Sequence, residues 1–347
     1  MPGVFDSKSF NAEVFGKYLE TVPRIKQNAM LKAGILRTRS ELKSMLVDQT
    51  GGNFITVPMS GRIGGDPLNY DGTTNVTADG LDTFLQSMIV VGRMKAWKEK
   101  DFTKDITGKD FMEVIAGQVG DYWDDVDQTT ILKTLDGIFG VSAFATSNST
   151  DITSAATAAD QVAGPTTLNN AIQKAAGANK GIYTLAIVHS QVATNLENLQ
   201  ILSYWKENDE NGMQRPVALA SWNGRTVLID DDVPVEEVAA SGSNPAYTKY
   251  TSYLLGQGAF DYCDCGAKVS NETWRDPKAG GGEDWLITRQ RKVFAPKGFS
   301  FVQPTTPIVS PTDVQLATAA RWALVKNNAN QTYPTKAIPI ARIISRG

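Results

Sequence analysis

The sequence predicts an α+β protein organised around one long helix and several strands spread along the chain. An apolar stripe at helical spacing covers residues 108–136 and predicts the helix. Short β-favouring runs, such as Phe54–Met59 and Tyr183–Ser190, predict the strands. The chain has 347 residues, of which 41% are hydrophobic and 20% charged, which suits one large domain or two to three subdomains.

The charge balance argues against a protein that coats nucleic acid. The formal net charge is −3, whereas proteins that grip phosphates usually carry a basic excess. The sequence has no run of about 18 apolar residues, so it predicts no transmembrane helix and no membrane partner. The first residues lack a basic start followed by an apolar stretch, so we expect no secretory signal and a cytoplasmic chain.

Residues 1–50 are interpreted as an N-terminal arm. Helical spacing of charged and apolar residues occurs over residues 11–20 and again over residues 33–46. Neither stretch is long enough to form a stable helix alone, so we expect the arm to pack on another surface.

An extended hairpin is predicted next. The β-favouring runs Phe54–Met59 and Phe84–Trp97 flank Ser60–Gly80, a polar tip rich in glycine, aspartate and asparagine. A two-stranded ribbon is only marginally stable in water, so this arm needs a partner surface. The tip lacks the glycine spacing of nucleotide-binding loops. It also lacks the regular calcium-loop spacing with a closing glutamate, and a loose calcium site remains a minor alternative.

The long helix is expected to begin with Thr107 as its cap and Asp110 in the third position, an arrangement similar to a capping box. From Gly108 to Asp136 it would measure ~44 Å at 1.5 Å per residue. Gly117 and Gly120 weaken its middle and indicate a bend or a close contact.

The remainder of the chain alternates between helical and β-favouring patterns after a small, polar stretch, residues 141–166, that is interpreted as a loop. Ser190 is a plausible cap for the second of the predicted helices, and Ser310 for the last. The predicted helices are residues 167–177, 190–202 and 310–325, and the predicted strands are Tyr183–Ser190, Arg225–Pro234, Tyr250–Phe260, residues 267–276, 284–296 and 336–344.

The single histidine, His189, invites a catalytic alternative. Ser190 follows it and Asp230 lies further on, so a hydrolase-like triad of these three residues is one reading. However, Ser190 lies outside any G-x-S-x-G elbow, which disfavours that reading. One histidine also excludes the usual histidine-rich metal sites.

Two further clusters are interpreted without a metal. Cys263 and Cys265 are one residue apart, so a disulfide between them would be strained, and we expect free thiols. The acidic triplet Asp230, Asp231 and Asp232 follows a predicted strand and suits a solvated turn better than a magnesium site, because no second acidic cluster is evident.

Aromatic and basic residues alternate at Trp274–Arg275 and along Trp285–Lys292. Such pairs occur in modules that stack on single-stranded nucleic acid. Since the chain has no basic excess, we favour a ribbon whose charges meet the acids of a neighbouring subunit.

In its order of parts, the sequence resembles the major capsid proteins of tailed bacteriophages, which share the Hong Kong 97-like fold. The hairpin "FITVPMSGRIGGDPLNYDGTTNVTADGLDTFLQSMIVVGRMKAW" looks like the E-loop, and "DFMEVIAGQVGDYWDDVDQTTILKTL" looks like the spine helix of the P domain. "YTLAIVHSQVATNLENL" and "ASWNGRTVLIDDDVP" look like the A domain, and "YTSYLLGQGAF" like the strand that leaves it. "VSNETWRDPKAGGGEDWLITRQRKVFAP" resembles the P-domain strands and the P-loop near three-fold axes.

The resemblance implies a division of the chain into named parts. These are an N-terminal arm at 1–50, an E-loop at 51–97, a P domain at 98–140 and 261–302, an A domain at 141–260, and a C-terminal extension at 303–347 that packs on the A domain.

The resemblance also implies a structural coat protein, without catalytic residues or cofactors, that assembles into pentamers and hexamers of an icosahedral head around double-stranded DNA. Expected partners are other copies of the chain, a scaffolding protein, a portal and decoration proteins, with weak non-specific contact to DNA. Assembly is expected in the cytoplasm of a bacterial host. The candidate inter-subunit contacts are Arg62, Asp66, Asn69, Tyr70, Asp71, Asp230, Asp231, Asp232, Arg275, Asp276, Lys278, Glu283, Asp284, Arg289 and Arg291.

The sequence departs from some relatives in two respects. Some carry a scaffolding segment before the N-terminal arm, whereas here the arm starts within the first residues, which implies a separate scaffold or prior cleavage. Some cross-link through an E-loop lysine, but no lysine lies between Phe54 and Arg93, so no such cross-link is expected. An encapsulin-like nanocompartment shell protein is the alternative with the same fold, and a hydrolase-like enzyme is the alternative of another class.

Overall fold

The computed structural model describes residues 34–48, 53–61, 63, 66–76, 78, 80–107, 111–208, 214–240 and 245–347. Their contacts divide the chain into two compact units. In the described residues, unit 1 comprises 93–128 and 266–290, and unit 2 comprises 34–92, 129–265 and 291–347, with the gaps just given. Three elements contribute residues to both units: strand β3 (Thr83–Lys100), helix α5 (Phe111–Phe139) and strand β13 (Glu283–Pro296).

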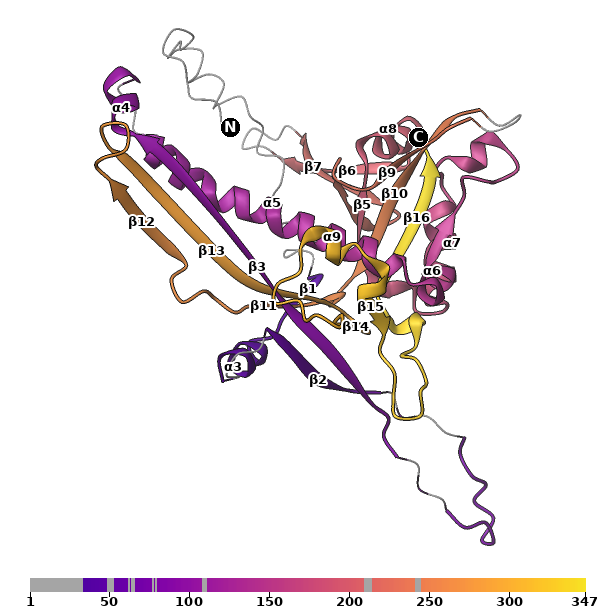
Figure 1. The fold of residues 1–347 in the computed structure, drawn as a ribbon. Coiled ribbons are helices and arrows are strands. Elements are labelled where there is room, and N and C mark those ends of the chain that lie inside the picture. Colours follow the sequence, from indigo (N-terminus) through magenta and orange to yellow (C-terminus); the bar gives the residue numbers. More distant parts are fainter. Residues whose placement is uncertain are drawn as a thin grey trace. The chain divides into compact units, whose positions relative to one another are not determined.

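Unit 1 is a β ribbon with a helix packed on it. Strand β12 (Asn271–Asp276) pairs antiparallel with the first part of β13, from Asn271 opposite Thr288 to Asp276 opposite Glu283. β13 in turn neighbours β3 (Figure 1). From α5, the indole of Trp123 donates to the hydroxyl of Thr288 at 3.1 Å, which ties the helix to the ribbon. The short helix α4 (Asp101–Thr107) follows β3 directly.

Unit 2 contains two β-sheet regions, and the first of them carries the predicted hairpin. Strand β2 (Phe54–Ser60) pairs antiparallel with β3, with Phe54 opposite Ile89 and Ser60 opposite Thr83. At the other edge, β1 (Leu36–Thr38) pairs parallel with β11 (Phe260–Asp264), which is antiparallel to β13. Helix α3 (Glu41–Asp48) covers this region, and its Leu42 and Leu46 join a core with Ile55 and Val57 of β2.

The second sheet of unit 2 has the order β4-β16-β10-β5-β8-β7-β6, with β9 also paired to β10 (Figure 1). β5 and β8 are parallel, as are β16 and β4, and the other neighbours are antiparallel. The strands are β4 (Ser149–Asp151), β5 (Tyr183–Val188), β6 (Leu202–Asn208), β7 (Gln214–Trp222), β8 (Arg225–Ile229), β9 (Val235–Val238), β10 (Tyr247–Gly256) and β16 (Ile340–Arg346).

Helices bury the faces of this sheet. The amphipathic helices α7 (Thr167–Ala176) and α8 (Ser190–Asn198) place Leu168, Ile172 and Leu196 in one core together with β5. The C-terminal turns of α5 place Leu135 and Ile138 in a second core, where both are fully buried beside Tyr253 of β10. A small sheet of β14 (Phe299–Phe301) and β15 (Trp322–Leu324) closes this core.

The structure corrects the prediction for residues 33–46. Leu36–Thr38 forms strand β1, and the helix α3 covers only Glu41–Asp48. The physical reason is tertiary: the backbone of β1 pairs with β11, and a parallel partner outweighs weak helix propensity. The predicted helix at residues 11–20 and the candidate contact Arg62 lie outside the described residues.

The long helix is present, and α5 continues to Phe139, beyond the predicted end at Asp136. Thr107, the predicted cap, is the last described residue of α4, and the predicted start at residues 108–110 lies outside the described residues. Residues 141–166 are not a simple loop, because α6 (Ser142–Asn148), β4 and the 3₁₀ helix η1 (Ala158–Gln161) form there. Phe144 is fully buried and Asn148 donates to the carbonyl of Ile340, so part of this stretch packs into the core.

Two predicted caps are also wrong. The predicted helix over residues 310–325 is reduced to α9 (Asp313–Leu316), and Thr312, not Ser310, caps it through a capping box with Gln315. At α8 the cap is His189, whose Nδ1 accepts from the backbone N–H of Gln191 at 3.1 Å. The remaining 3₁₀ helices are η2 (Lys180–Ile182), η3 (Ala319–Arg321) and η4 (Thr335–Ala337). Among the described helices, none combines the length and apolarity that a membrane crossing requires.

Candidate assembly surfaces

The tip of the hairpin arm exposes an unusual number of apolar side chains. We define the tip as residues 61–81, which connect the last paired residues of the two strands, Ser60 and Thr83. Tyr70 is fully exposed, and Ile63 and Val76 are 81% and 89% exposed. A monomer gains nothing from presenting these side chains to water, so the tip has the composition of a contact surface.

Asp71 organises the centre of the tip. Its Oδ1 accepts from the backbone N–H groups of Thr73 at 2.9 Å and Thr74 at 2.7 Å, and its Oδ2 accepts from the Thr74 hydroxyl at 2.8 Å. The same bonds lower the pKa of Asp71 well below its usual value. Asn69 also donates to Asp71, at 3.4 Å. The predicted contact residues Asp66, Asn69, Tyr70 and Asp71 are therefore exposed, and Asp71 has in addition a structural role in the turn.

The acidic turn after β8 separates its three carboxylates. Asp230 is buried, at 5% exposure, and its Oδ1 accepts from the backbone N–H of Asp232. Asp231 is 67% exposed at its side chain, and its Oδ1 accepts from the backbone N–H of Ser190 at 3.1 Å. Asp232 is exposed as well. Asp231 and Asp232 are thus accessible to a partner, whereas Asp230 holds the turn from inside.

These positions do not assemble the triad of Ser190, His189 and Asp230 that the sequence disfavours. The Ser190 hydroxyl lies 3.5 Å from His189 Nδ1, and that nitrogen already accepts the N–H of Gln191. A nitrogen used in this way is not available as a general base. The carboxylate near His189 Nε2 belongs to Asp231, at 3.7 Å, and not to Asp230.

In unit 1, most of the predicted contact charges are paired within the chain. Arg275 donates to Asp101 and to Asp284, with Nη1 2.8 Å from Asp284 Oδ2, and these bonds raise its pKa. Glu283 is buried beside the ammonium groups of Lys98, at 3.3 Å, and Lys100, at 3.7 Å.

Two further basic candidates, Arg289 and Arg291, are also engaged. Arg289 pairs with Glu272 at 3.0 Å in unit 1. In unit 2, Arg291 donates to the side chain of Asn53 at 2.7 Å. The rings of Trp285 and Trp274 lie 5.9 Å apart between centroids, and the ammonium group of Lys98 lies over the Trp285 ring. The Trp285 ring is therefore already in contact with side chains of its own chain.

The turn between β12 and β13 leaves two candidates at its surface. The carboxylate of Asp276 accepts from the backbone N–H of Lys278 at 2.9 Å, and the side chain of Lys278 is exposed. On the neighbouring helix α4, Phe102 and Ile106 are 63% and 48% exposed, and Trp274 is 52% exposed. Sequence reasoning selected the charges and Trp274 of this ribbon but missed Phe102 and Ile106, whose four-residue spacing already places them on one helix face.

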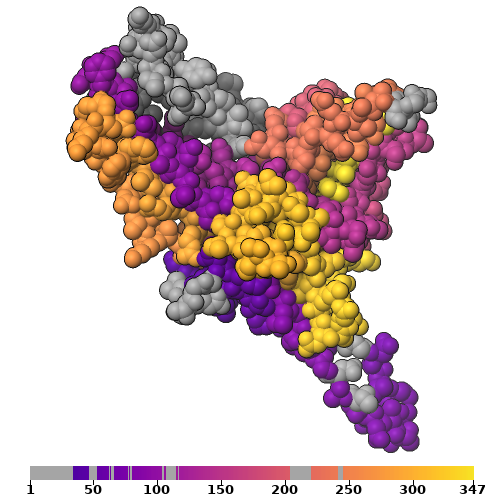
Figure 2. Space-filling model, viewed as in Figure 1, coloured from indigo at the N-terminus to yellow at the C-terminus, as the bar shows by residue number. Residues whose placement is uncertain are grey.

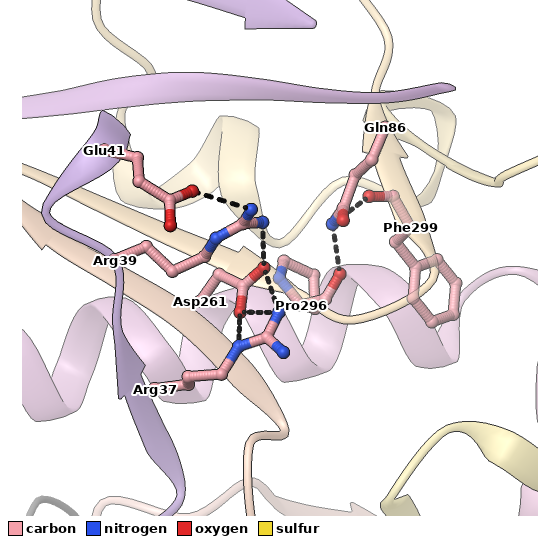
Figure 3. A network of polar contacts seen from close by, with 7 residues as sticks. All are labelled: Arg37, Arg39, Glu41, Gln86, Asp261, Pro296 and Phe299. Carbon is pink, nitrogen blue, oxygen red and sulfur yellow. Dashed lines mark hydrogen bonds and ion pairs between the residues drawn. The ribbon is translucent and has the colours of Figure 1, made fainter. Parts of the chain in front are cut away.

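A second group that the sequence did not single out surrounds Asp261. This carboxylate is 1% exposed and accepts from Arg37 Nε at 2.7 Å and from Arg39 Nη1 at 3.2 Å (Figure 3). Arg39 also pairs with Glu41 at 3.3 Å. Residues so far apart in the chain give no local signal, so this cluster is visible only in the structure.

The cysteines are free and buried, as predicted. Burial raises the pKa of the Cys265 thiol to about 12, and the neighbouring Cys263 adds to the rise. In the described part of the chain, the histidine, cysteine and acidic side chains form no group of three suited to a metal ion.

Comparison with known proteins points in one direction. No family profile matches the chain. The major capsid protein of Bacillus phage SPP1 is 27% identical over 315 residues, covering 90% of this chain and 91% of that protein. The fold is similar to the capsid of Ralstonia phage GP4, with a TM-score of 0.57, 11% identity, and coverage of 91% and 88% of the two chains. It is also similar to the Cyanophage Pam1 capsid, with a TM-score of 0.55, 11% identity, and coverage of 90% and 89%.

Proposed function

We infer that this chain is the major capsid protein of a tailed bacteriophage, a structural subunit of the virion and not an enzyme. The observation that carries this inference is the end-to-end similarity to the Bacillus phage SPP1 protein, which leaves little of either chain unmatched. Phage capsids with a similar fold support it independently of sequence identity. Because these relatives are phage capsids, they favour a phage shell over an encapsulin-like nanocompartment.

In the finer assignment, the chain has the Hong Kong 97-like fold, with the N-terminal arm at 1–50, the E-loop at 51–97, the P domain at 98–140 and 261–302, and the A domain at 141–260. The extended hairpin of β2 and β3 supports the E-loop, and the 29-residue helix α5 supports the spine helix. Residues 303–347 are assigned as an extension packed on the A domain, a view supported by β16, which pairs with β10 from Lys249 to Leu255.

The subunit contacts are reassigned in part. Asp66, Asn69, Tyr70, Asp231, Asp232 and Lys278 have exposed side chains and remain candidates for contact with a neighbouring copy. A charge that already has a partner within the chain contributes less free energy to binding a neighbouring subunit, because the new contact must compete with the existing ion pair. We therefore expect Glu283, Arg275 and Arg289 to shape the ribbon, while the exposed apolar side chains supply most of the contact energy.

The proposed assembly consists of pentamers and hexamers in an icosahedral head that encloses double-stranded DNA and forms in the host cytoplasm. A net charge of −3 suits a shell that does not grip the DNA it contains, since strong phosphate binding would oppose packing and release. Scaffolding, portal and decoration proteins complete the set of expected partners.

The proposal is tested by negative-stain microscopy of the purified chain, alone and with a co-expressed scaffolding protein. We expect hollow particles, or rings of five and six subunits. A chain that stays monomeric under both conditions at high concentration contradicts the proposal. Nuclease-resistant DNA inside particles recovered from infected cells separates a phage head from a nanocompartment that holds protein cargo.

A further inference from the structure

The C-terminal part of the chain runs alongside the strands that carry the hairpin arm. We define the root of the arm as β2, Asp82 and residues 83–92 of β3, and the bracing segment as residues 296–333. Both belong to unit 2, so their contacts lie within one compact body. Figure 1 shows β14, β15 and the loop that follows them beside β3, and Figure 2 shows this segment covering part of the root.

At the outer end of the root, the bracing segment reaches the last paired residues. Asn327 forms an antiparallel bridge with Phe84, and its side-chain amide donates to Asp82 Oδ1 at 3.3 Å. The ring of Tyr333 meets the ring of Phe84 edge to face, with 5.3 Å between centroids. Asn327 is itself held by the backbone N–H of Gln331, which donates to its Oδ1 at 2.8 Å. The contact therefore comes from an ordered turn.

In the middle of the root, side chains bond directly to backbone groups. The amide of Gln86, which is fully buried, donates to the carbonyls of Pro296 at 2.9 Å and Phe299 at 3.0 Å (Figure 3). The backbone N–H of Ser87 donates to the hydroxyl of Ser300 at 3.0 Å, and that hydroxyl lies 3.3 Å from the carbonyl of Leu85. These bonds tie the backbone of β3 to Ser300 of β14.

At the inner end, the hydroxyl of Ser310 accepts from the N–H of Gly92 at 2.9 Å and lies 3.2 Å from its carbonyl. The side chain of Asn53 donates to the carbonyl of Val309 at 3.0 Å. The bracing segment thus contacts β3 from Gly92 out to Phe84 and then Asp82, and it also bonds to Asn53, the residue before β2.

Beyond Asp82 this support ends. The described tip residues make side-chain hydrogen bonds only to one another, around Asp71. The boundary is the bond from the N–H of Gly61 to the carbonyl of Asp82, at 2.7 Å. A Cβ at Gly61 would stand 2.9 Å from the ring of Phe84 and 3.0 Å from Asp82, so this position is packed tightly against the root.

We propose that residues 296–333 brace the root of the arm before assembly, so that the arm bends beyond Gly61 and Asp82 and not within its strands. This rests on the proposed function only in assigning the tip to contact with a neighbouring subunit. A root that is already ordered presents the tip in a restricted set of directions, which reduces the conformational entropy lost on binding. Asn327 is the positioning residue at the outer end of the brace.

Hydrogen exchange of the full-length monomer tests the brace directly. In Asn327→Ala we expect amides of residues 82–87 to exchange faster by on the order of tenfold, as loss of a hydrogen-bonded contact predicts. Amides of the buried strand Tyr183–Val188 serve as the reference for intact folding. The matched control is Asn328→Ala, on the same turn with an exposed side chain, which should exchange like the native chain.

Equal exchange at residues 82–87 in the native chain and in Asn327→Ala overturns the proposal, as does faster exchange in Asn328→Ala. If Asn327→Ala fails to fold, Ser310→Ala at the inner end replaces it, with faster exchange expected near Gly92. Assembly is read separately: we expect Asn327→Ala to form shells several-fold more slowly at equal concentration. A native chain that forms no shells rejects the proposed function, whereas the exchange comparison still decides the brace.

Discussion

Arg37 holds the buried carboxylate of Asp261 with two hydrogen bonds, from Nε to Oδ1 at 2.7 Å and from Nη2 to Oδ2 at 3.0 Å (Figure 3). The two residues are partners in the strand register as well, because Arg37 lies opposite Asp261 where β1 pairs with β11. A three-residue parallel pairing is weak alone, so the ion pair is a main reason that β1 stays at this edge.

Asp261→Asn should lower the free energy of unfolding by about 2–3 kcal/mol. A fully buried pair that loses one partner costs about 3–5 kcal/mol, and the smaller figure applies here because Arg37 is 53% exposed and can be solvated. Urea unfolding followed by tryptophan fluorescence measures the change. The control is Glu41→Gln, whose exposed pair with Arg39 should contribute less than about 0.5 kcal/mol. Equal losses of unfolding free energy in Asp261→Asn and Glu41→Gln contradict the assignment of Asp261 as the main stabilising carboxylate.

The pair of Asp136 and Tyr253 predicts a pH dependence. The Tyr253 hydroxyl donates to Asp136 Oδ1 at 2.6 Å, and burial raises the pKa of Asp136 above its usual 3.8. A carboxyl whose pKa rises on folding stabilises the fold most below its unfolded pKa, and this contribution is lost as pH rises through the folded pKa. Burial raises the pKa of Tyr253 well above 10, so it stays a donor throughout.

Asp136→Asn keeps an oxygen for Tyr253 and removes the charge. We therefore expect the variant to be more stable than the native chain at pH 7, on the order of 1 kcal/mol, with the difference shrinking as pH falls towards 3.8. Tyr253→Phe should act in the opposite direction at pH 7, with a loss of about 1.5–3 kcal/mol from an unpartnered carboxylate oxygen. Urea unfolding at pH 7, 6 and 5 measures both stability differences. If the difference between Asp136→Asn and the native chain grows as the pH falls, the predicted pH dependence is wrong.

Periodic patterns predicted the long helix and the hairpin well, because α5 and the pair β2–β3 carry their apolar residues at regular spacing. The failures occur where a distant partner decides the local structure. Leu36–Thr38 became a strand because of β11, and Ser310 bonds to Gly92 and leaves the cap of α9 to Thr312. A prediction from the sequence alone does not include these partners, so it follows the local helical pattern.

The candidate contacts show the same limit. Sequence patterns identified Arg275 and Asp284 as surface charges, and both are on the ribbon, but the structure pairs them with each other and with Asp101. The apolar residues Phe102 and Tyr70 are more exposed than sequence reasoning expects of their type. Whether a charge is already paired depends on tertiary distances, which no spacing rule contains.

Particles of this protein should contain no covalent cross-link through the arm. The stretch from Phe54 to Arg93 contains no lysine, so its tip cannot supply an amine for an isopeptide bond. Boiled, denatured particles should run as a single-chain band on a gel. A ladder of covalent multimers contradicts this prediction, and mass spectrometry of the ladder would then identify the residues joined.

Shortening the tip should separate folding from assembly. Replacing Gly61–Asp79 with a short glycine–serine turn removes exposed side chains such as Tyr70 and Val76 and leaves the strand pairing from Phe54 to Ser60 in place. Loop length has a weak effect on stability, so the free energy of unfolding should change by less than about 1 kcal/mol. Shell formation should be lost, because the tip would no longer reach or bind a neighbour.

The matched control, Tyr70→Ser with Val76→Ser, keeps the length and removes only apolar contacts, so an intermediate loss of shells assigns part of the binding energy to those side chains. Normal shells from the shortened chain, counted by negative-stain microscopy at equal protein concentration, contradict an assembly role for the arm.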